Sequence, residues 1–140
     1  MSGCIFCSMV RGQAKATKVF EDEKILVVMD IKPITNGHML VIPKKHAELL
    51  TELDDEYVGD MFKTAKKVAK ALKKSKLRCG GVNYLLADGA EAGQDVYHAH
   101  LHVIPRYRSD GFYLHMPAKY DKETSDDDLE NAAGKIRAKL

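Results

Sequence analysis

Three histidines lie at every second position in the segment His98-Ala99-His100-Leu101-His102. Alternate side chains of a β-strand point to opposite faces, so this spacing predicts that the three imidazoles share one face. Imidazole has an unperturbed pKa of about 6.5, so near neutral pH it can act as a nucleophile, a general acid or a donor to an anion. Chemistry at phosphorus needs all three roles. His98 and His102 would lie roughly 13 Å apart along a strand rising ~3.3 Å per residue, so the three cannot share one metal ion.

A glycine-containing loop, residues 88–95, comes directly before these histidines. Gly89 and Gly93 have no side chains, so backbone N–H groups near them can approach a phosphate closely. Such a loop alone is a weak indication of a phosphate site. A loop that leads into a histidine-bearing strand is a much stronger one.

Two of the three cysteines form the motif Cys4-Ile5-Phe6-Cys7. In a reducing compartment this spacing favours a metal site or a redox pair over a structural disulfide. A thioredoxin-like motif lies at the end of a strand that leads into a helix, whereas this one lies almost at the start of the chain. A metal site is therefore favoured. Cys79, which stands alone beside two glycines, is expected to be a small and partly buried side chain.

The elements that must position these residues follow from the pattern of apolar residues. Spacing of three and four predicts one long helix over about residues 54–75. Five strands are predicted over residues 19–20, 25–30, 39–43, 82–86 and 98–104. A closing helix is suggested by Leu129, Ala132, Ala133, Ile136 and Leu140. Consecutive strands with short connections pair antiparallel, so the order favours an α+β fold over a doubly wound parallel sheet.

The composition restricts the class of protein. The 140 residues suffice for about one domain, and 45% hydrophobic with 30% charged residues indicates a globular chain. The formal charge of +2 gives no bulk electrostatic argument for nucleic-acid binding, and the lysine-rich stretch 63–78 is expected to be the solvated face of the long helix. No apolar stretch reaches the ~18–20 residues of a membrane helix. No secretory signal is visible, so a cytoplasmic location is expected.

The segment His98-Ala99-His100-Leu101-His102-Val103-Ile104 resembles the signature of the histidine triad (HIT) superfamily, in which hydrophobic residues alternate with the histidines. The resemblance extends to Asp30-Ile31-Lys32-Pro33 and to the stretches 37–46 and 90–94. It covers about residues 3–107. The chain is more similar to Hint-like and bacterial HIT hydrolases than to the uridylyltransferase branch, which places Pro between two catalytic histidines where this chain has Ala99.

The resemblance implies one domain over residues 1–140, with a core of about 3–107 and a C-terminal segment of 108–140. It implies an antiparallel sheet that continues across a homodimer. The implied enzyme is a hydrolase or transferase that acts on the α-phosphate of purine nucleotides, AMP or GMP derivatives. Its substrates would be phosphoramidates, aminoacyl adenylates or dinucleoside polyphosphates. The reaction would pass through a covalent nucleotidyl-histidine and release a nucleoside monophosphate.

The resemblance also implies roles for individual residues. His100 would be the nucleophile, His102 would hold phosphate oxygens and His38 would orient the triad or relay a proton. The implied nucleotide-binding residues are Phe6, Val28, Asp30, Ile31, Gly93, Gln94 and Asp95. A structural zinc ion would be bound by Cys4, Cys7, His46 and His98, thiolates and imidazoles being ligands that suit Zn²⁺. As a ligand, His98 would orient the strand and would not protonate the leaving group. No organic cofactor is implied.

Two positions depart from the family pattern. Ala87 stands where relatives usually have Asn or Gln, so one hydrogen bond near the phosphate is absent. Asp95 stands where many have Ser or Thr, and a carboxylate there would repel a phosphate unless it were protonated or turned away.

Two other functions stay open from the sequence. The same pocket could serve a non-catalytic nucleotide-binding module that regulates a partner. Alternatively, Cys4, Cys7 and the lysine-rich helix suggest a zinc-dependent nucleic-acid module, which would bind polynucleotides with a steep dependence on salt. The near-neutral total charge argues against that module, and no specific nucleic acid is expected as a partner.

Overall fold

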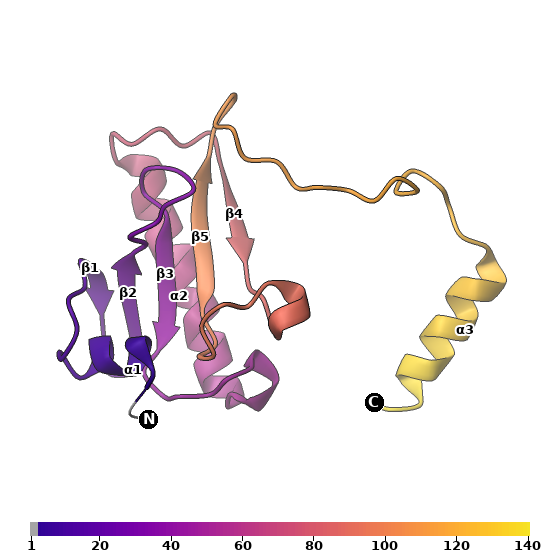
Figure 1. Cartoon of the computed structure of the whole chain (residues 1–140), viewed down its shortest axis with the longest axis horizontal. Coiled ribbons are helices and arrows are strands. Elements are labelled where there is room, and N and C mark those ends of the chain that lie inside the picture. Colours follow the sequence, from indigo (N-terminus) through magenta and orange to yellow (C-terminus); the bar gives the residue numbers. More distant parts are fainter. Residues whose placement is uncertain (1–2) are drawn as a thin grey trace.

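The computed structural model describes residues 3–140 and contains a five-stranded antiparallel sheet with a long helix on one face (Figure 1). The strands are β1 (Lys18–Glu21), β2 (Ile25–Met29), β3 (Met39–Pro43), β4 (Gly81–Leu85) and β5 (Leu101–Arg106), and the helices are α1 (Ile5–Val10), α2 (Asp55–Lys74) and α3 (Asp126–Arg137). Short 3-10 turns span Leu50–Glu52 and Ala90–Ala92. The strand order is β1-β2-β3-β5-β4, because α2 connects β3 to the far edge and β5 returns between them. The predicted α+β fold is confirmed.

The core lies between α2 and the sheet. Acidic residues in the first turn of α2 and lysines in its last turn interact favourably with the helix dipole and so stabilise the helix. One stripe of the helix is buried, and it packs on alternate residues of the central strands, among them Val27, Val41 and Leu101. The residues between these, including Leu26 and Val28, form a second apolar cluster on the opposite face. Since β2 and β3 are covered on both faces, they are continuous apolar runs in the sequence.

Helix α1 covers the second face of the sheet and was not predicted. It begins after Cys4, whose sulfur accepts the backbone N–H of Cys7 at 3.4 Å. Phe6 is only 4% exposed and packs against Leu26, Val28 and other members of the second cluster. The N-terminal segment is therefore anchored to the sheet by an apolar side chain as well as by its cysteines.

The predicted boundaries of the histidine-bearing strand were wrong. Strand β5 begins at Leu101, so His98 and His100 precede it and only His102 lies within it. The N–H of His98 donates to the carbonyl of Val96 at 2.9 Å, and the N–H of Ala99 donates to Ala47 at 2.8 Å. These bonds hold the backbone before Leu101 outside the sheet ladder. The three histidines therefore do not line one face of a regular strand.

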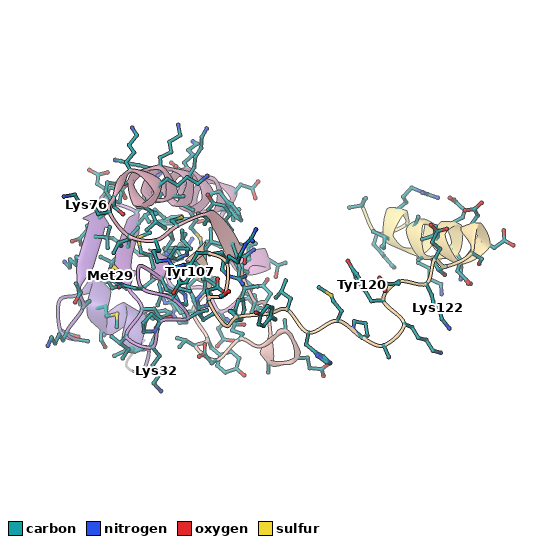
Figure 2. All side chains as sticks on the ribbon, turned by 90° about the horizontal axis from the view of Figure 1, so that it is seen from above. Met29, Lys32, Lys76, Tyr107, Tyr120 and Lys122 are labelled. Carbon is teal, nitrogen blue, oxygen red and sulfur yellow. The ribbon has the colours of Figure 1, made fainter. Side chains whose placement is uncertain are left out.

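A C-terminal arm, residues 107–125, leads away from the sheet beyond the β4 edge and ends in α3. Figures 1 and 2 both show α3 well apart from the rest of the molecule. The predicted C-terminal helix is present, but it does not close the core, since none of its residues is buried. Within residues 3–140, no helix combines the length and apolar character needed to cross a membrane.

Candidate active site and metal centre

A cavity of about 410 Å³ opens on the face of the sheet that α1 covers. Five of the predicted nucleotide-binding residues line it, namely Phe6, Val28, Asp30, Ile31 and Asp95. His38, His100 and His102 line it as well. Apolar walls beside a few convergent polar groups are typical of small-molecule sites. The structure thus brings most of the predicted site together in one cavity.

The backbone fixes the tautomer of His100. Its Nδ1 lies 2.7 Å from the carbonyl oxygen of His98, and a carbonyl can only accept a hydrogen bond. In the neutral imidazole the proton is therefore on Nδ1, and Nε2 keeps its lone pair. Phe6 packs edge-on against the His100 ring, with centroids 5.0 Å apart. The free nitrogen of His100 is thus Nε2, and its lone pair is available for a reaction or a hydrogen bond.

A second chain of hydrogen bonds orients His102. The backbone N–H of Ile34 donates to His38 Nδ1 at 3.0 Å, so the proton of neutral His38 is on Nε2. His38 Nε2 lies 2.8 Å from His102 Nδ1 and donates to it. His102 therefore carries its own proton on Nε2, where it can donate to a ligand in the cavity. Such a donor suits a phosphate oxygen.

Burial keeps this pair of histidines neutral. Burial, together with charge on His100 and His38, lowers the pKa of His102 to about 4. Burial also lowers the pKa of His38, although the carboxylate of Asp30 opposes that shift. Both side chains are therefore uncharged hydrogen-bonding groups near neutral pH.

The loop between β2 and β3 holds His38 and Asp30 in place. Thr35 Oγ1 donates to the carbonyl of Pro105 at 2.6 Å, which ties the loop to β5. Gly37 has a φ of +102°, a conformation that favours glycine, and a Cβ there would lie 3.1 Å from Leu77. The sequence motif around Gly37 and His38 is thus a turn that aims His38 at His102.

Asp30 faces the cavity beside this pair. Its Oδ1 accepts the N–H of Lys32 at 2.8 Å, and its Oδ2 lies 3.5 Å from His38 Nε2. Asp30, His38 and His102 form a group compact enough to suggest a metal site. The hydrogen bonds argue against one, because the His38 nitrogen that faces the group carries the proton. Asp30 instead presents a carboxylate that can accept hydroxyl groups.

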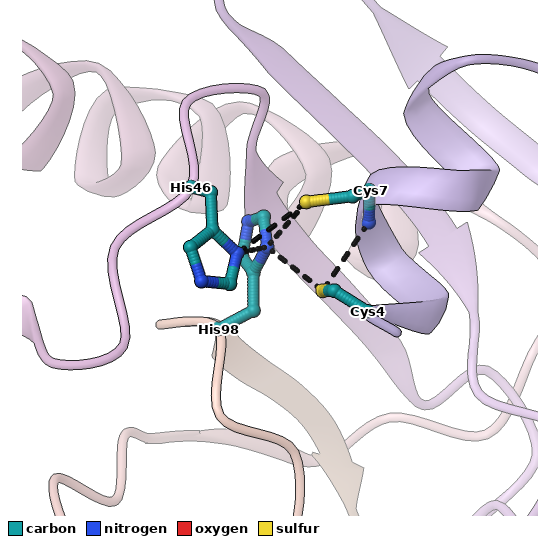
Figure 3. Close-up of side chains that lie close together, drawn as sticks. All are labelled: Cys4, Cys7, His46 and His98. Atoms are coloured by element: carbon teal, nitrogen blue, oxygen red, sulfur yellow. Dashed lines mark hydrogen bonds between the residues drawn. The ribbon is translucent and has the colours of Figure 1, made fainter. Parts of the chain in front are cut away.

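Cys4, Cys7, His46 and His98 form a second compact group, in which α1, the loop after β3 and the segment before β5 meet (Figure 3). His98 Nδ1 lies 3.3 Å from Cys4 Sγ and 3.1 Å from His46 Nδ1, and Cys7 Sγ lies 3.4 Å from His46 Nδ1. Zinc bonds of ~2.0–2.3 Å in a tetrahedron place ligand atoms about 3.3–3.8 Å apart. The four side chains therefore fit a closed structural zinc site.

The surroundings of this group also suit a metal. His98 Nε2 donates to the carbonyl of Pro43 at 2.7 Å, which leaves Nδ1 free to bind an ion. Burial and the neighbouring Cys4 raise the pKa of the Cys7 thiol, so a thiolate there needs a cation beside it. The chemistry of the donors and their protonation thus agree with zinc.

The comparisons with known proteins decide the family. The model of the HIT domain matches residues 11–109. "Protein hit" of Bacillus subtilis is 39% identical over 138 residues, which are 98% of this chain and 94% of that protein. The chain belongs to the HIT family. A relative from Arabidopsis thaliana, named adenylylsulfatase HINT3, is 34% identical, with 87% of this chain and 64% of that protein covered.

Solved structures of HIT proteins agree with the fold. A HIT family protein of Bacillus anthracis is 38% identical, with 99% and 97% of the two chains covered and a TM-score of 0.90. Residues 107–140 are about a quarter of this chain, so agreement at that level requires the arm and α3 to superpose too.

Two further HIT structures are named for what they bind. A zinc-bound histidine triad protein of Mycobacterium smegmatis is 36% identical, with 99% of each chain covered and a TM-score of 0.77. A histidine triad nucleotide-binding protein of Candida albicans is 34% identical, with 99% and 97% covered and a TM-score of 0.87.

Within this HIT domain, Gly93 and Gln94 lie outside the lining of the cavity. Gln94 is 5% exposed, and its amide donates to the carbonyls of Glu48 and Val96 at 2.7 and 3.1 Å. Its Oε1 accepts the N–H of Gly89 at 2.7 Å. The side chain thus holds the glycine loop in shape from behind. Its predicted contact with the nucleotide stays a prediction.

Other lining residues were missed in the sequence. Ile5 and Met9 come from α1, whose single amphipathic turn is too short to predict reliably from periodicity. Ile34 and Val96 also line the cavity, and Ile34 contributes through its backbone N–H, which every residue except proline has. The spacing of Ile5, Phe6 and Met9 was the one available sign of a helix face.

Proposed function

We propose that this HIT protein is a hydrolase or transferase that acts on the α-phosphate of nucleoside 5′-phosphate derivatives. The observation that supports this most directly is the orientation of His100. Its Nδ1–H is held by the carbonyl of His98, so Nε2 is a free nucleophile in a cavity that also contains His102 and Asp30. The names of relatives, an adenylylsulfatase and a nucleotide-binding protein, support the same class of substrate.

In the proposed reaction, Nε2 of His100 attacks the α-phosphorus and forms a P–N bond as the bond to the leaving group breaks. The leaving group departs with the bonding electron pair. Water then attacks the same phosphorus, and the nucleoside monophosphate leaves as the P–N bond to His100 breaks. The proton that the water loses goes to solvent, which also protonates the leaving group. Two displacements replace one difficult step. His102 donates from Nε2 to a phosphate oxygen, and Asp30 accepts the ribose hydroxyls.

The apolar wall formed by Phe6, Val28 and Ile31 suits a purine base, so derivatives of AMP or GMP are the proposed substrates. Phosphoramidates, aminoacyl adenylates and dinucleoside polyphosphates are the proposed types. Asp95 also lines the cavity and is exposed, so its carboxylate can turn toward solvent and away from a phosphate. A cytoplasmic location and a homodimer with a continuous sheet complete the proposal.

We also propose that Cys4, Cys7, His46 and His98 hold a structural zinc ion. When bound, zinc supplies a cross-link between α1 and the catalytic segment. His98 then has two functions, since its side chain is a ligand and its carbonyl orients His100. As a ligand it cannot protonate the leaving group.

The test mixes the purified protein with an adenosine 5′-phosphoramidate and, separately, with diadenosine tetraphosphate. AMP release is followed, and rapidly quenched protein is weighed by mass spectrometry. We expect AMP release and an adenylate adduct on His100, both absent from His100→Ala. His115→Ala is the matched control, because His115 lies exposed on the arm and should keep full activity. Binding without turnover or adduct would favour the alternative, a non-catalytic nucleotide-binding module.

A further inference from the structure

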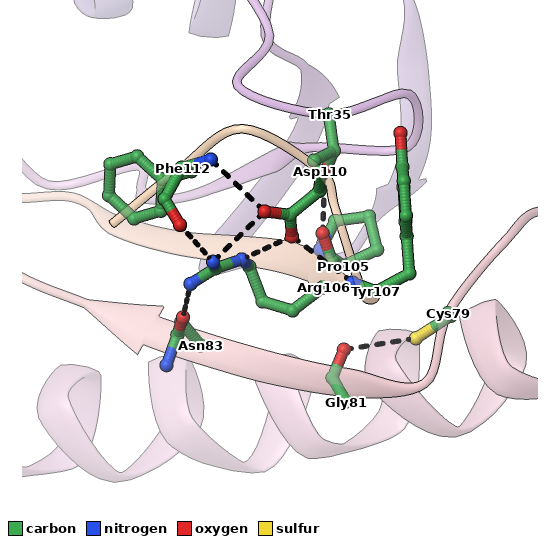
Figure 4. Close-up of polar contacts among 9 residues, drawn as sticks. All are labelled: Thr35, Cys79, Gly81, Asn83, Pro105, Arg106, Tyr107, Asp110 and Phe112. Atoms are coloured by element: carbon green, nitrogen blue, oxygen red, sulfur yellow. Dashed lines mark hydrogen bonds and ion pairs between the residues drawn. The ribbon is translucent and has the colours of Figure 1, made fainter. Parts of the chain in front are cut away.

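The arm leaves the sheet from a well-defined root (Figure 4). Arg106 Nε donates to Asp110 Oδ2 at 2.7 Å, and its Nη1 donates to Asn83 Oδ1 at 2.5 Å. Asp110 also accepts the N–H groups of Tyr107 and Phe112, at 3.1 and 3.0 Å. The Arg106 guanidinium holds the pKa of the Asp110 carboxyl well below its usual range. The fold therefore sets the direction in which the arm departs.

Helix α3, at the end of this arm, has an apolar stripe with no partner in its own chain. Leu129 is 54% exposed and Ile136 is 64% exposed. Among residues 3–140, every hydrogen bond and ion pair formed by residues 113–140 stays within that segment. An isolated helix of 12 residues is marginal in water and is usually stabilised by packing of its apolar face. The apolar stripe of α3 therefore needs a surface to pack against.

A suitable surface lies between the C-terminal end of α2 and the start of β1, and we call it the α2 groove. It is a cavity of about 200 Å³, and its apolar lining includes Val19, Met29, Val68, Leu72 and Leu77. Ala71 joins it to a hollow of about 410 Å³ lined by Lys63, Lys66, Lys67, Lys70 and Lys74. Within residues 3–140 the ion pairs of these lysines are limited to that of Lys63 with Asp60, at 3.8 Å. The groove is thus apolar with an uncompensated basic border.

The charges of α3 complement this border. Asp126 and Glu130 flank the apolar stripe of α3, whereas Asp127 lies on the opposite side of the helix, as 3.6 residues per turn require. We propose that α3 of each copy docks in the α2 groove of a second copy of this chain. Leu129 and Ile136 then lie in the apolar part of the groove, and the acidic residues face the lysines.

The position of α3 favours a second copy over its own groove. The α2 groove lies on the β1 side of the sheet, and α3 lies beyond the opposite edge, which is β4 (Figures 1 and 2). A half-turn about an axis perpendicular to the sheet and beside β4 carries the groove of one copy toward α3 of the other. The same half-turn sets the two β4 edges antiparallel. Two identical contacts then form, as in a closed two-fold dimer.

A zero-length carbodiimide cross-link between carboxylates and amines tests the contact. Equal amounts of ¹⁴N- and ¹⁵N-labelled full-length protein are unfolded together, refolded, cross-linked and digested. We expect cross-linked peptide pairs that join Asp126 or Glu130 to Lys67, Lys70 or Lys74. In about half of these pairs, one peptide should carry ¹⁴N and the other ¹⁵N. Links confined to a single isotope would place α3 on its own chain and overturn the proposal, as would the absence of these links.

Matched variants test the energetics. Ile136→Asp should raise the dimer dissociation constant at least about tenfold, which is 1.4 kcal/mol, whereas Asn131→Asp on the opposite side of α3 should not. Asp126→Lys should weaken the dimer more than Asp127→Lys does. Adding Lys70→Glu and Lys74→Glu to Asp126→Lys should restore the affinity of the dimer.

Sedimentation measures the dissociation constants. Equal effects of Ile136→Asp and Asn131→Asp, or of Asp126→Lys and Asp127→Lys, would contradict docking through this face of α3.

Discussion

At the scale of single residues, backbone groups determine what each histidine can do. The N–H of Ile34 determines which nitrogen of His38 carries the proton. The carbonyl of His98 does the same for His100, and the carbonyl of Pro43 does so for His98. Each of these backbone groups has a fixed role as donor or acceptor, so each fixes one tautomer. The histidines therefore differ in which nitrogen donates and which accepts, although all of them have the same imidazole side chain.

The relay from His38 to His102 is expected to support turnover. His38→Phe keeps the volume of a side chain that is 2% exposed but removes the donor to His102. We expect kcat for AMP release to fall about 10²-fold, within the range for a positioned proton donor. The adduct should still form on His100. His115→Phe serves as control, and an unchanged kcat in His38→Phe would rule out the relay.

Neutral His102 is expected to make folding sensitive to acid. In the unfolded chain it takes up a proton near pH 6.5, but in the folded protein only near pH 4, so stability is lost as pH falls between these values. Between pH 7 and pH 5 the loss should be on the order of 1 kcal/mol after allowing for its partial exposure. Urea unfolding at pH 7 and pH 5 measures it. His102→Asn should show a smaller loss, and equal losses would contradict the assignment.

At the scale of elements, α1 is a small helix with two attachments. Phe6 anchors it to the sheet and packs against His100, and Cys4 and Cys7 bring it to His98. A metal ion would close a long loop between the N-terminus and the segment before β5, which favours the folded state. The proposed metal site, the wall of the cavity and the proposed nucleophile His100 are thus connected through α1.

Removing the proposed metal ligand Cys7 is expected to loosen this connection. Cys7→Ser, or treatment with a chelator, should lower Tm by about 5 °C or more, since 1 kcal/mol corresponds to several degrees in a domain of this size. Amide exchange in residues 5–10 should become faster. Cys79→Ser is the matched control, because Cys79 lies outside the cluster. Elemental analysis should find one zinc per chain in the wild type and less in Cys7→Ser. An unaltered zinc content in Cys7→Ser would be inconsistent with this site.

At the scale of the whole molecule, the sheet and the arm point toward a second copy. The outer edge of β4 is not paired within residues 3–140, and Tyr84 and Leu85 on it are 48% and 42% exposed. The arm extends beyond the same edge. The proposed two-fold axis beside β4 would account for both features, and the dimer would then be held by backbone pairing and by α3.

The first part of the arm is expected to influence the choice of leaving group. Replacing Phe112, Tyr113 and Leu114 with alanine should change the ratio of kcat/KM for phosphoramidate and diadenosine tetraphosphate by several-fold. The exposed Tyr113 and the half-buried Phe112 there can contact a leaving group that extends out of the cavity. Lys119→Ala is the control. A constant ratio in the triple variant would exclude this role.

The sequence by itself predicted the fold class and, through the family resemblance, many of the residues that line the cavity. Apolar periodicity located α2 and the central strands, because these elements bury whole faces and leave a repeating pattern. The spacing of Cys4 and Cys7 indicated a metal site or a redox pair. The family resemblance then supplied His46 and His98 as further ligands, together with the roles of the triad.

Only the tertiary structure decided where β5 begins, that α1 exists and which nitrogen of each histidine is free. Those features depend on contacts between residues distant in the sequence, such as Ala99 with Ala47 and Ile34 with His38. Backbone donors and acceptors are the same in nearly every residue, so the sequence does not mark which of them will meet a histidine. The position of α3 was likewise undetermined, because its apolar stripe predicts a partner surface but not which chain provides it.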